Sequence, residues 1–365
     1  MDAALTEATL NLAIKIQQIP APTFHEDSRA RFIYDRFAAE GLSAVSIDPH
    51  GNVFGCIRGS GGGKPLVVSA HLDTVFPETT DLSITRTEDR IIGPGIGDNS
   101  VGLAGLFGLL WILRRRPAAL PGDVWLVANV CEEGLGDLRG MRAVVDRFVS
   151  QPMAYIVLEG MALGQVYNRG LGVRRFQISI ETPGGHSWVD YGSPSAIHEL
   201  LTLASSITQL QLPDQPRTTL NIGKIAGGVS VNTIAPEAHL ELDLRSENPQ
   251  VLEHIAAQVE SLAAGAQRTG VRIAVKLIGS RPAGEIPSED RLVRLACKCV
   301  EQVSLQPRLN IGSTDANIPL SRGLPAICVG LTVGAGAHTL QEYIYIRPLS
   351  LGLKQLASLV EQLFL

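Results

Sequence analysis

The segment at residues 67–75 constrains the fold of this chain more than any other stretch of its sequence. An apolar run leads into His71, and Asp73 follows two positions later. A short apolar run of this kind is typical of a buried strand in a parallel sheet. Side chains two positions apart in an extended segment point to the same side, so Asp73 can orient the ring of His71, as carboxylates do behind metal-binding imidazoles. Taken alone, the pair is better interpreted as a polar strand end.

Two further apolar runs also end in acidic residues. The run at 124–130 leads into Glu132 and Glu133, and the run at 154–158 leads into Glu159. Adjacent carboxylates at a buried strand end repel each other and cost stability unless a partner compensates them. In open α/β sheets, chemistry gathers where the strands end at their carboxyl edge. We therefore expect these acids to lie together at one edge of a sheet.

Two loop residues complete the candidate set. Asp98 stands just before an amphipathic stretch at 101–114, where an aspartate alone would be interpreted as a helix cap, and His338 follows a glycine-rich loop. Two imidazoles with an excess of carboxylates suit divalent zinc, cobalt or manganese. Because the donors are too many for one tetrahedral ion, we expect two ions that share a bridging carboxylate and activate water. The expected set is His71, Asp98, Glu132, Glu133, Glu159 and His338.

The order of the expected elements predicts an α/β protein with two domains. At 365 residues the chain is too long for one ordinary core. Residues 172–283 follow the order strand, helix, strand, strand, helix, strand, which is the ferredoxin-like α+β pattern. We expect them to form an inserted lid and dimerisation domain. Residues 1–171 and 284–365 would form a discontinuous catalytic domain. In the lid strand at 239–245, strict alternation places Arg245 on the face opposite the leucines.

Composition excludes several other classes of protein. The chain is 45% hydrophobic with mixed charge, which is typical of a globular protein. Its net charge of −5 offers no basic surface for nucleic acid, and no apolar run is expected to be long enough to span a membrane. The charged, helically spaced residues 1–18 do not have the pattern of a signal peptide. Five cysteines without a CxxC pair indicate a reduced, cytoplasmic protein.

With these residues identified, the chain resembles the M20 family of metallopeptidases. This family includes aminotripeptidases, glutamate carboxypeptidases, acetylornithine and succinyl-diaminopimelate deacylases, and aminoacylases. The resemblance implies a zinc-peptidase-like catalytic domain with a mixed sheet flanked by helices. The segments Gly185-His186-Ser187 and 232–245 match the family's lid. The expected catalytic domain matches the family in five motifs, which are Ser69-Ala70-His71-Leu72-Asp73-Thr74-Val75, Gly97-Asp98-Asn99, Glu132-Glu133-Gly134, Glu159-Gly160 and His338-Thr339.

The resemblance implies a role for each matching residue of the catalytic domain. One ion would be bound by His71, Asp98 and Glu159. The other would be bound by Asp98, Glu133 and His338, so that Asp98 bridges the two. Glu132, which neighbours a ligand, would be the general acid/base, and Asp73 would orient His71.

The resemblance also assigns residues to the substrate. Arg245 and Asn232 would hold a substrate carboxylate or carbonyl group. His186 would reach the active site of the partner subunit in a homodimer and supply a further hydrogen-bond donor to the developing oxyanion. The loop residues that would line the pocket are Gly312, Ser313 and Thr314.

Two functions of different class remain open. The first is a di-metal hydrolase that cleaves the amide bond of a small peptide, with an N-acyl amino acid deacylase as the alternative within the same family. Glu159, where deacylases often have aspartate, and the segment Ser313-Thr314-Asp315-Ala316-Asn317 favour the peptidase branches. The second is a non-catalytic protein whose degenerate metal site only captures small ligands. The presence of every expected ligand and of Glu132 favours the enzyme.

Overall fold

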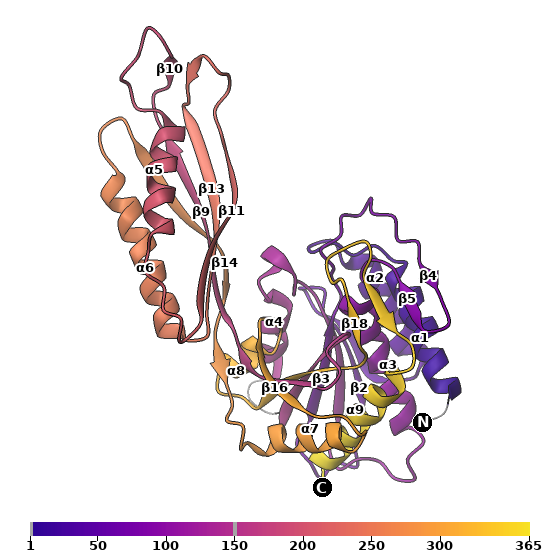
Figure 1. Ribbon diagram of the computed structural model, residues 1–365. Coiled ribbons are helices and arrows are strands. Elements are labelled where there is room, and N and C mark those ends of the chain that lie inside the picture. Colours follow the sequence, from indigo (N-terminus) through magenta and orange to yellow (C-terminus); the bar gives the residue numbers. More distant parts are fainter. Residues whose placement is uncertain (1–2, 149–151) are drawn as a thin grey trace. The chain divides into compact units, whose positions relative to one another are not determined.

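The computed structural model describes residues 3–148 and 152–365, and the chain divides into two compact units (Figure 1). Met1–Gly170 and Gly284–Leu365 together form one of them, which we call the discontinuous unit. Leu171–Ala283 forms the other, which we call the inserted unit.

A mixed sheet forms the centre of the discontinuous unit. Its strand order is β1-β2-β6-β3-β7-β17-β8-β15, and β16 also pairs with β8. The neighbours β6, β3, β7 and β17 run parallel, whereas β1, β2 and β15 add antiparallel pairs at the two edges. The strands are β1 (Ser43–Ile47), β2 (Val53–Ile57), β3 (Leu66–His71), β6 (Val124–Asn129), β7 (Ala154–Glu159), β8 (Gln165–Gly170), β15 (Gly284–Glu285), β16 (Arg308–Gly312) and β17 (Ala326–Gly330).

Helices cover both faces of this sheet. The helix α3 packs on β3 and β7 with α1 and α9 beside it, while α4 and α8 lie on the other side (Figure 1). Both faces of β3 are therefore buried, which explains why its sequence is a continuous apolar run rather than an alternating one. The expected α/β architecture is confirmed. The helices are α1 (Ala3–Gln17), α2 (Asp27–Ala39), α3 (Val101–Leu113), α4 (Arg139–Phe148), α7 (Arg291–Glu301), α8 (Asn317–Ser321) and α9 (Leu349–Leu363).

One expectation about apolar runs is wrong as stated. By length and composition alone, Ile96–Leu113 could cross a membrane. This stretch includes α3, and 83% of it is buried within the protein. The helix was expected to be amphipathic, but it is apolar on all sides because it is surrounded by the sheet and by other helices, as in the core of a large domain.

A second, smaller sheet joins two segments that lie far apart in the sequence. Its order is β18-β19-β5-β4, with β19 (Tyr343–Tyr345) antiparallel to β5 (Arg90–Ile92). The outer strands are β18 (Gly334–Ala335) and β4 (Thr85–Arg86). Through this pairing, the chain before the short helical turn Ile96–Ser100 lies beside the chain that follows β18.

The inserted unit is an antiparallel sheet with two helices. The sheet has the order β11-β13-β9-β14, and the connections produce the expected strand and helix order. Leu240, Leu242 and Leu244 are buried in the unit's own core. The elements are β9 (Gly172–Glu181), α5 (Ala196–Thr208), β11 (Thr218–Gly227), β13 (Glu237–Ser246), α6 (Pro249–Ala266) and β14 (Arg272–Arg281), with a small pair formed by β10 (Gly185–His186) and β12 (Thr233–Ile234).

Candidate metal centre

The parallel strands bring four of the expected residues to one edge of the central sheet. His71 is the last residue of β3 and lies opposite Asn129, the last residue of β6. The chain continues from β6 into Glu132 and Glu133, and β7 ends at Glu159. Because parallel strands end at the same edge, their carboxyl ends place these groups together. His71 is almost completely buried, and the two glutamates after β6 are each only 6% exposed.

Asp98 and His338 reach the same place from loops. Asp98 lies in the short turn before α3, and its peptide bond to Asn99 is cis. His338 lies between β18 and β19, in the left-handed backbone region. The antiparallel pairing of β5 with β19 holds the two loops side by side. Asp98 is mostly buried, whereas half of the His338 side chain is exposed.

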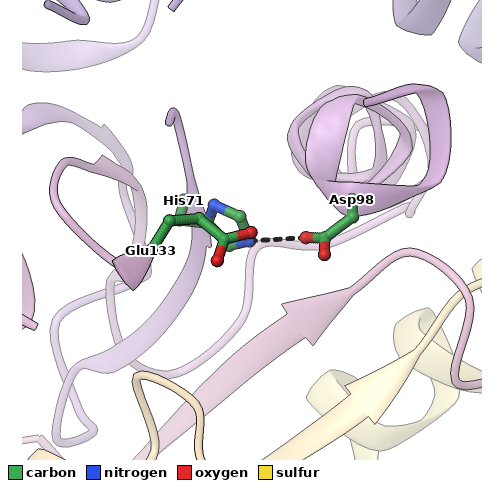
Figure 2. A group of neighbouring side chains, drawn as sticks. All are labelled: His71, Asp98 and Glu133. Atoms are coloured by element: carbon green, nitrogen blue, oxygen red, sulfur yellow. Dashed lines mark hydrogen bonds and ion pairs between the residues drawn. The ribbon is translucent and has the colours of Figure 1, made fainter. Parts of the chain in front are cut away.

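The side chains meet around Asp98, whose two carboxylate oxygens contact different imidazoles. Oδ1 lies 3.0 Å from Nε2 of His71, and Oδ2 lies 3.2 Å from Nε2 of His338. Nε2 of His338 is also 3.1 Å from Oε1 of Glu133. Donor atoms of His71, Asp98 and Glu133 all lie within 4.8 Å of one another (Figure 2). Glu159 is close as well, with Oε2 3.9 Å from Nε2 of His71.

Asp73 contacts His71 mainly through its backbone. Its carbonyl oxygen lies 3.0 Å from Nδ1 of His71, whereas its carboxylate is 3.6 Å away. The carboxylate instead accepts the backbone N–H groups of Glu132 and Glu133, at 2.9 and 2.8 Å, and the hydroxyl of Thr23. Asp73 therefore fixes both the imidazole and the loop that follows β6. With Nδ1 bonded to an oxygen, Nε2 of His71 faces the cluster as a ligand atom.

The charges in the cluster are unbalanced. Burial opposes protonation of His71, but its bonds to Asp73 and Asp98 outweigh this and raise its pKa well above 6.5. Hydrogen bonds to Asp98 and Glu133 raise the pKa of His338 to about 10. Burial, together with the charges of Asp98 and Glu132, raises the pKa of Glu159 well above its usual value. The cluster thus requires positive charge.

Divalent ions fit this donor set. Nitrogen and oxygen donors from imidazoles and carboxylates are ligands that zinc, cobalt and manganese accept. Ions would supply the charge that protons on the imidazoles otherwise supply, and binding would release those protons. Asp98 offers one oxygen to each imidazole, which is the arrangement that a bridging carboxylate requires.

The expected pocket loop is tied to the same sheet edge. Gly312 ends β16, and the backbone N–H of Thr314 donates to Oδ1 of Asn317. Two residues after Ser313, the buried Asp315 accepts a hydrogen bond of 2.6 Å from Nδ2 of Asn129. Since Asn129 pairs with His71 between neighbouring strands, this loop is held beside the metal centre.

The remaining expected residues belong to the inserted unit. Asn232 lies near His186, because its carbonyl accepts the N–H of Ser187 at 3.0 Å. Arg245 lies elsewhere, on β13, where its Nε donates to Oδ2 of Asp243 at 2.6 Å. Its side chain remains 42% exposed.

Sequence reasoning missed two buried glutamates that support the site. Glu26 accepts the N–H of Cys131 at 3.1 Å, just before the Glu132 loop. Glu342 accepts backbone N–H groups of the segment that carries Asp98, and burial raises its pKa to about 7. Neither glutamate follows an apolar run, and their partners are backbone groups, so no pattern of side chains in the sequence identifies them.

The fold and the cluster together define an α/β protein with a candidate two-ion centre of imidazoles and carboxylates. The model of the peptidase family M20/M25/M40 matches residues 67–362, and the chain therefore belongs to this family. The family is metal-dependent, which agrees with the cluster around Asp98. The resemblance seen in the motifs is confirmed, as is the expectation of an enzyme.

Three relatives illustrate the range of this family. An uncharacterized protein of Bacillus subtilis, YqjE, is 24% identical, and the match covers 96% of each chain. A protein of Aspergillus flavus named "Probable carboxypeptidase" is 25% identical over 74% of this chain and 70% of its own length. An acetylornithine deacetylase of Buchnera aphidicola is 27% identical over 81% of this chain and 80% of its own.

Solved structures share the fold over nearly the whole chain. A tripeptidase of Staphylococcus aureus superposes with a TM-score of 0.82, at 21% identity, over 98% of both chains. The aminopeptidase PepT of Bacillus cereus gives a TM-score of 0.80 at the same identity and coverage. YxeP of Bacillus subtilis, described as a dinuclear metal-binding peptidase of the M20 family, gives 0.69 at 18% identity over 99% of both chains.

Proposed function

We propose that this protein is a di-metal hydrolase that cleaves the amide bond of small peptides, in the manner of an aminotripeptidase or a carboxypeptidase. The observation that carries the proposal is the placement of Asp98 between His71 and His338, with one carboxylate oxygen towards each. This arrangement divides the donors into two groups that share one residue. His71, Asp98 and Glu159 would hold one ion, and Asp98, Glu133 and His338 the other.

Glu132 is the proposed general acid/base. When bound, two divalent ions, most suitably zinc, lower the pKa of a water molecule and polarise a carbonyl group. Glu132 would accept a proton from that water and pass it to the leaving amine. Its backbone N–H is fixed by Asp73, and it is the neighbour of the proposed ligand Glu133. Glu132 is buried, so its carboxylate would act in surroundings that exclude most water.

Residues outside the metal centre would select the substrate. Arg245 is proposed to bind a substrate carboxylate, because its planar guanidinium group suits bidentate pairing and its side chain is partly exposed. Asn232 would bind a carbonyl group. Gly312, Ser313 and Thr314 would line the pocket, since their loop is tied to the strand end beside His71.

A homodimer is also proposed, with His186 completing the partner's active site. Nδ1 of His186 lies 3.2 Å from the N–H of Trp188 and 3.4 Å from that of Val189. Bonding of Nδ1 as an acceptor favours the tautomer with the proton on Nε2, which could then donate to an oxyanion. Nearby apolar side chains are exposed, with Trp188 at 85% and Tyr191 at 90%, as at surfaces that pair with another protein. All five cysteines are free thiols, which supports a reducing, cytoplasmic location.

The alternative is an N-acyl amino acid deacylase of the same family. The acetylornithine deacetylase relative supports it, whereas the relative named as a carboxypeptidase and the glutamate at position 159 favour a peptidase. A non-catalytic binder is a weaker alternative, because Glu132 and every proposed ligand are present.

A hydrolysis screen tests the proposal. The purified protein is loaded in turn with zinc, cobalt or manganese and incubated with di- and tripeptides, with N-acetyl and N-succinyl amino acids, and with peptides blocked at either end. We expect a chelator to abolish the cleavage of free peptides and a divalent ion to restore it. Preference for the acylated amino acids would establish the deacylase alternative. Binding of two ions without cleavage of any amide would contradict an enzymatic role.

A further inference from the structure

Glu342 is a buried acid on the loop that carries His338. It follows His338 by four residues and has no solvent-exposed surface. Its backbone N–H donates to the carbonyl of Thr339 at 3.2 Å, so the loop from His338 to Glu342 is closed by a turn. The position of the Glu342 backbone is thus coupled to that of the histidine.

The carboxylate of Glu342 reaches the other loop of the metal centre. Oε1 accepts the N–H of Gly97 at 2.6 Å and that of Asp98 at 2.8 Å, and Oε2 accepts the N–H of Gly95 at 3.3 Å. One of these partners is the backbone of the proposed bridging residue itself. Hydrogen bonds to an ionised acceptor are shorter and stronger than those between neutral groups.

Strand pairing sets the position of this contact. Glu342 immediately precedes β19, and its carbonyl accepts the N–H of Gly93 at 2.8 Å, next to β5. The backbone then turns at Gly95, which has a φ of +72°, a conformation that a glycine adopts at little cost. This turn directs the N–H groups of Gly95, Gly97 and Asp98 towards the same carboxylate. Glu342 therefore connects the two loops at the point where each leaves the small sheet.

Burial of a carboxylate beside Asp98 is unfavourable unless hydrogen bonds compensate it. A neutral side chain would tie the loops together without placing a second negative charge near the bridging acid. Three backbone donors, however, can be gathered only by an acceptor with two oxygens and no hydrogen. The same saturation by backbone N–H groups leaves Glu342 poorly available as a ligand.

We infer that Glu342 is a positioning residue that fixes the separation of Asp98 and His338, and that the ion shared by Asp98, Glu133 and His338 depends on it. The inference rests on the proposed two-ion function. The other ion depends on it less, because His71 and Glu159 stand at the ends of core strands. His338, by contrast, is half-exposed on a loop that is held through Glu342.

The test compares Glu342→Gln and Glu342→Asp with a matched control. Glutamine keeps the size but presents an NH₂ group to a backbone donor, while aspartate keeps the charge and shortens the reach. The control is Glu40→Gln, a glutamate of the same unit that pairs with Arg36 and Arg114. Asp98 precedes the first residue of α3, and Arg114 follows its last residue. Because a helix of 13 residues is about 20 Å long, the control site lies far from Asp98.

Metal binding gives the decisive readout. Cobalt titrations followed by absorbance, with metal analysis after dialysis, measure the affinity for each of the two equivalents. In Glu342→Gln we expect the second equivalent of metal to bind about 10- to 100-fold more weakly, which is the usual effect of removing a residue that hydrogen-bonds a metal ligand. The affinity for the first equivalent should change less than threefold. Saturating metal should restore much of kcat, with KM little changed, and Glu342→Asp should lie between Glu342→Gln and the wild type.

Other results would overturn the inference. Unchanged affinity for both equivalents, with only a lower Tm of the metal-free protein, would make Glu342 a stabilising residue and nothing more. Equal weakening of both equivalents would also contradict it. If Glu342→Gln does not fold, the same criteria apply to Glu342→Asp. Because ion binding is measured apart from turnover, a wild-type protein that binds two ions but cleaves no amide would refute the proposed function and leave this test intact.

Discussion

The carboxylates of the candidate metal centre differ in their partners more than in their chemistry. Asp73 and Glu342 accept backbone N–H groups on both oxygens, which fixes them as supports. Asp98 and Glu133 face imidazoles, so their oxygens can bind ions that replace the protons there. The partner of each carboxylate, rather than its residue type, therefore indicates whether it binds a metal or holds a loop.

Glu132→Gln should separate catalysis from metal binding. Its backbone N–H bond to Asp73 does not depend on the side chain, so both ions and the fold should be retained. Loss of a general base commonly reduces the rate by about 10²- to 10⁴-fold, and a residue that is also the acid should cost more. The measurements are kcat, metal content and Tm. Glu133→Gln is the comparison and should lose an ion. Near-normal kcat in Glu132→Gln would assign proton transfer to another group.

Asp98→Ala and His338→Ala should differ in the number of ions that they lose. Removal of Asp98 takes a donor from both proposed ion positions, so occupancy of both should fall. Removal of His338 should weaken mainly the position near Glu133. Metal analysis after dialysis against buffered zinc compares the two variants. Full retention of two ions in Asp98→Ala would rule out a bridging role.

The sequence predicts the candidate site residues better than the residues that support them. His71, Glu132, Glu133 and Glu159 follow apolar runs, and parallel strands bring such run ends together. The contact of Glu342 with Asp98 spans 244 positions and involves a backbone N–H, which every residue except proline has. A sequence pattern carries no information about such a contact.

Among the elements, those with a regular apolar pattern could be predicted, and those without one could not. The strands β3, β6 and β7 are apolar runs, because each is covered on both faces. The strand β8 alternates partly exposed and buried residues, but its buried positions include Asn168 and Gly170, so its sequence lacks the apolar alternation that identifies a strand. The helix α4 has only 10 residues, but it buries Met141, Val144, Val145 and Phe148, a spacing that is typical of an amphipathic helix.

Close packing of β7 against the Asp98 turn leads to a prediction for Gly160. A Cβ at this position would lie 1.8 Å from the backbone oxygen of Gly97, an overlap that only a backbone shift can relieve. Gly160→Ala should therefore destabilise the protein by roughly 1–3 kcal/mol and also weaken metal binding. Urea unfolding and metal analysis measure the two effects.

Gly265→Ala provides the matched control for this substitution. Gly265 lies in α6, and nothing is within 4 Å of the position of its added Cβ. The change should be neutral or stabilising by up to about 1 kcal/mol, because alanine favours a helix. Equal destabilisation by both substitutions would show that the effect at Gly160 does not come from the overlap with Gly97.

The whole molecule divides its candidate residues between two units. The proposed metal ligands belong to the discontinuous unit, whereas His186, Asn232 and Arg245 belong to the inserted unit. The inserted unit has its own core and needs no residue of the other unit to complete its sheet. Such an insertion can contribute residues to its own chain's site or to that of a second copy, and biochemical complementation distinguishes these two arrangements.

Subunit mixing should restore activity if His186 acts across a homodimer. His186→Ala and Glu132→Ala are each expected to be inactive. In a heterodimer of the two, one site keeps its own Glu132 and receives the intact His186 of the partner. Equal mixing gives half heterodimers with one complete site each, so about a quarter of wild-type activity should return.

The control mixes Glu132→Ala with Asp98→Ala, because both changes disable the metal centre of their own chain and no heterodimer contains a complete site. Exchange of subunits is verified with differently tagged chains. The trans role of His186 fails if verified exchange restores no activity, or if the wild-type enzyme is an active monomer at its assay concentration. Recovery in the control mixture would show that turnover does not need both residues in one centre.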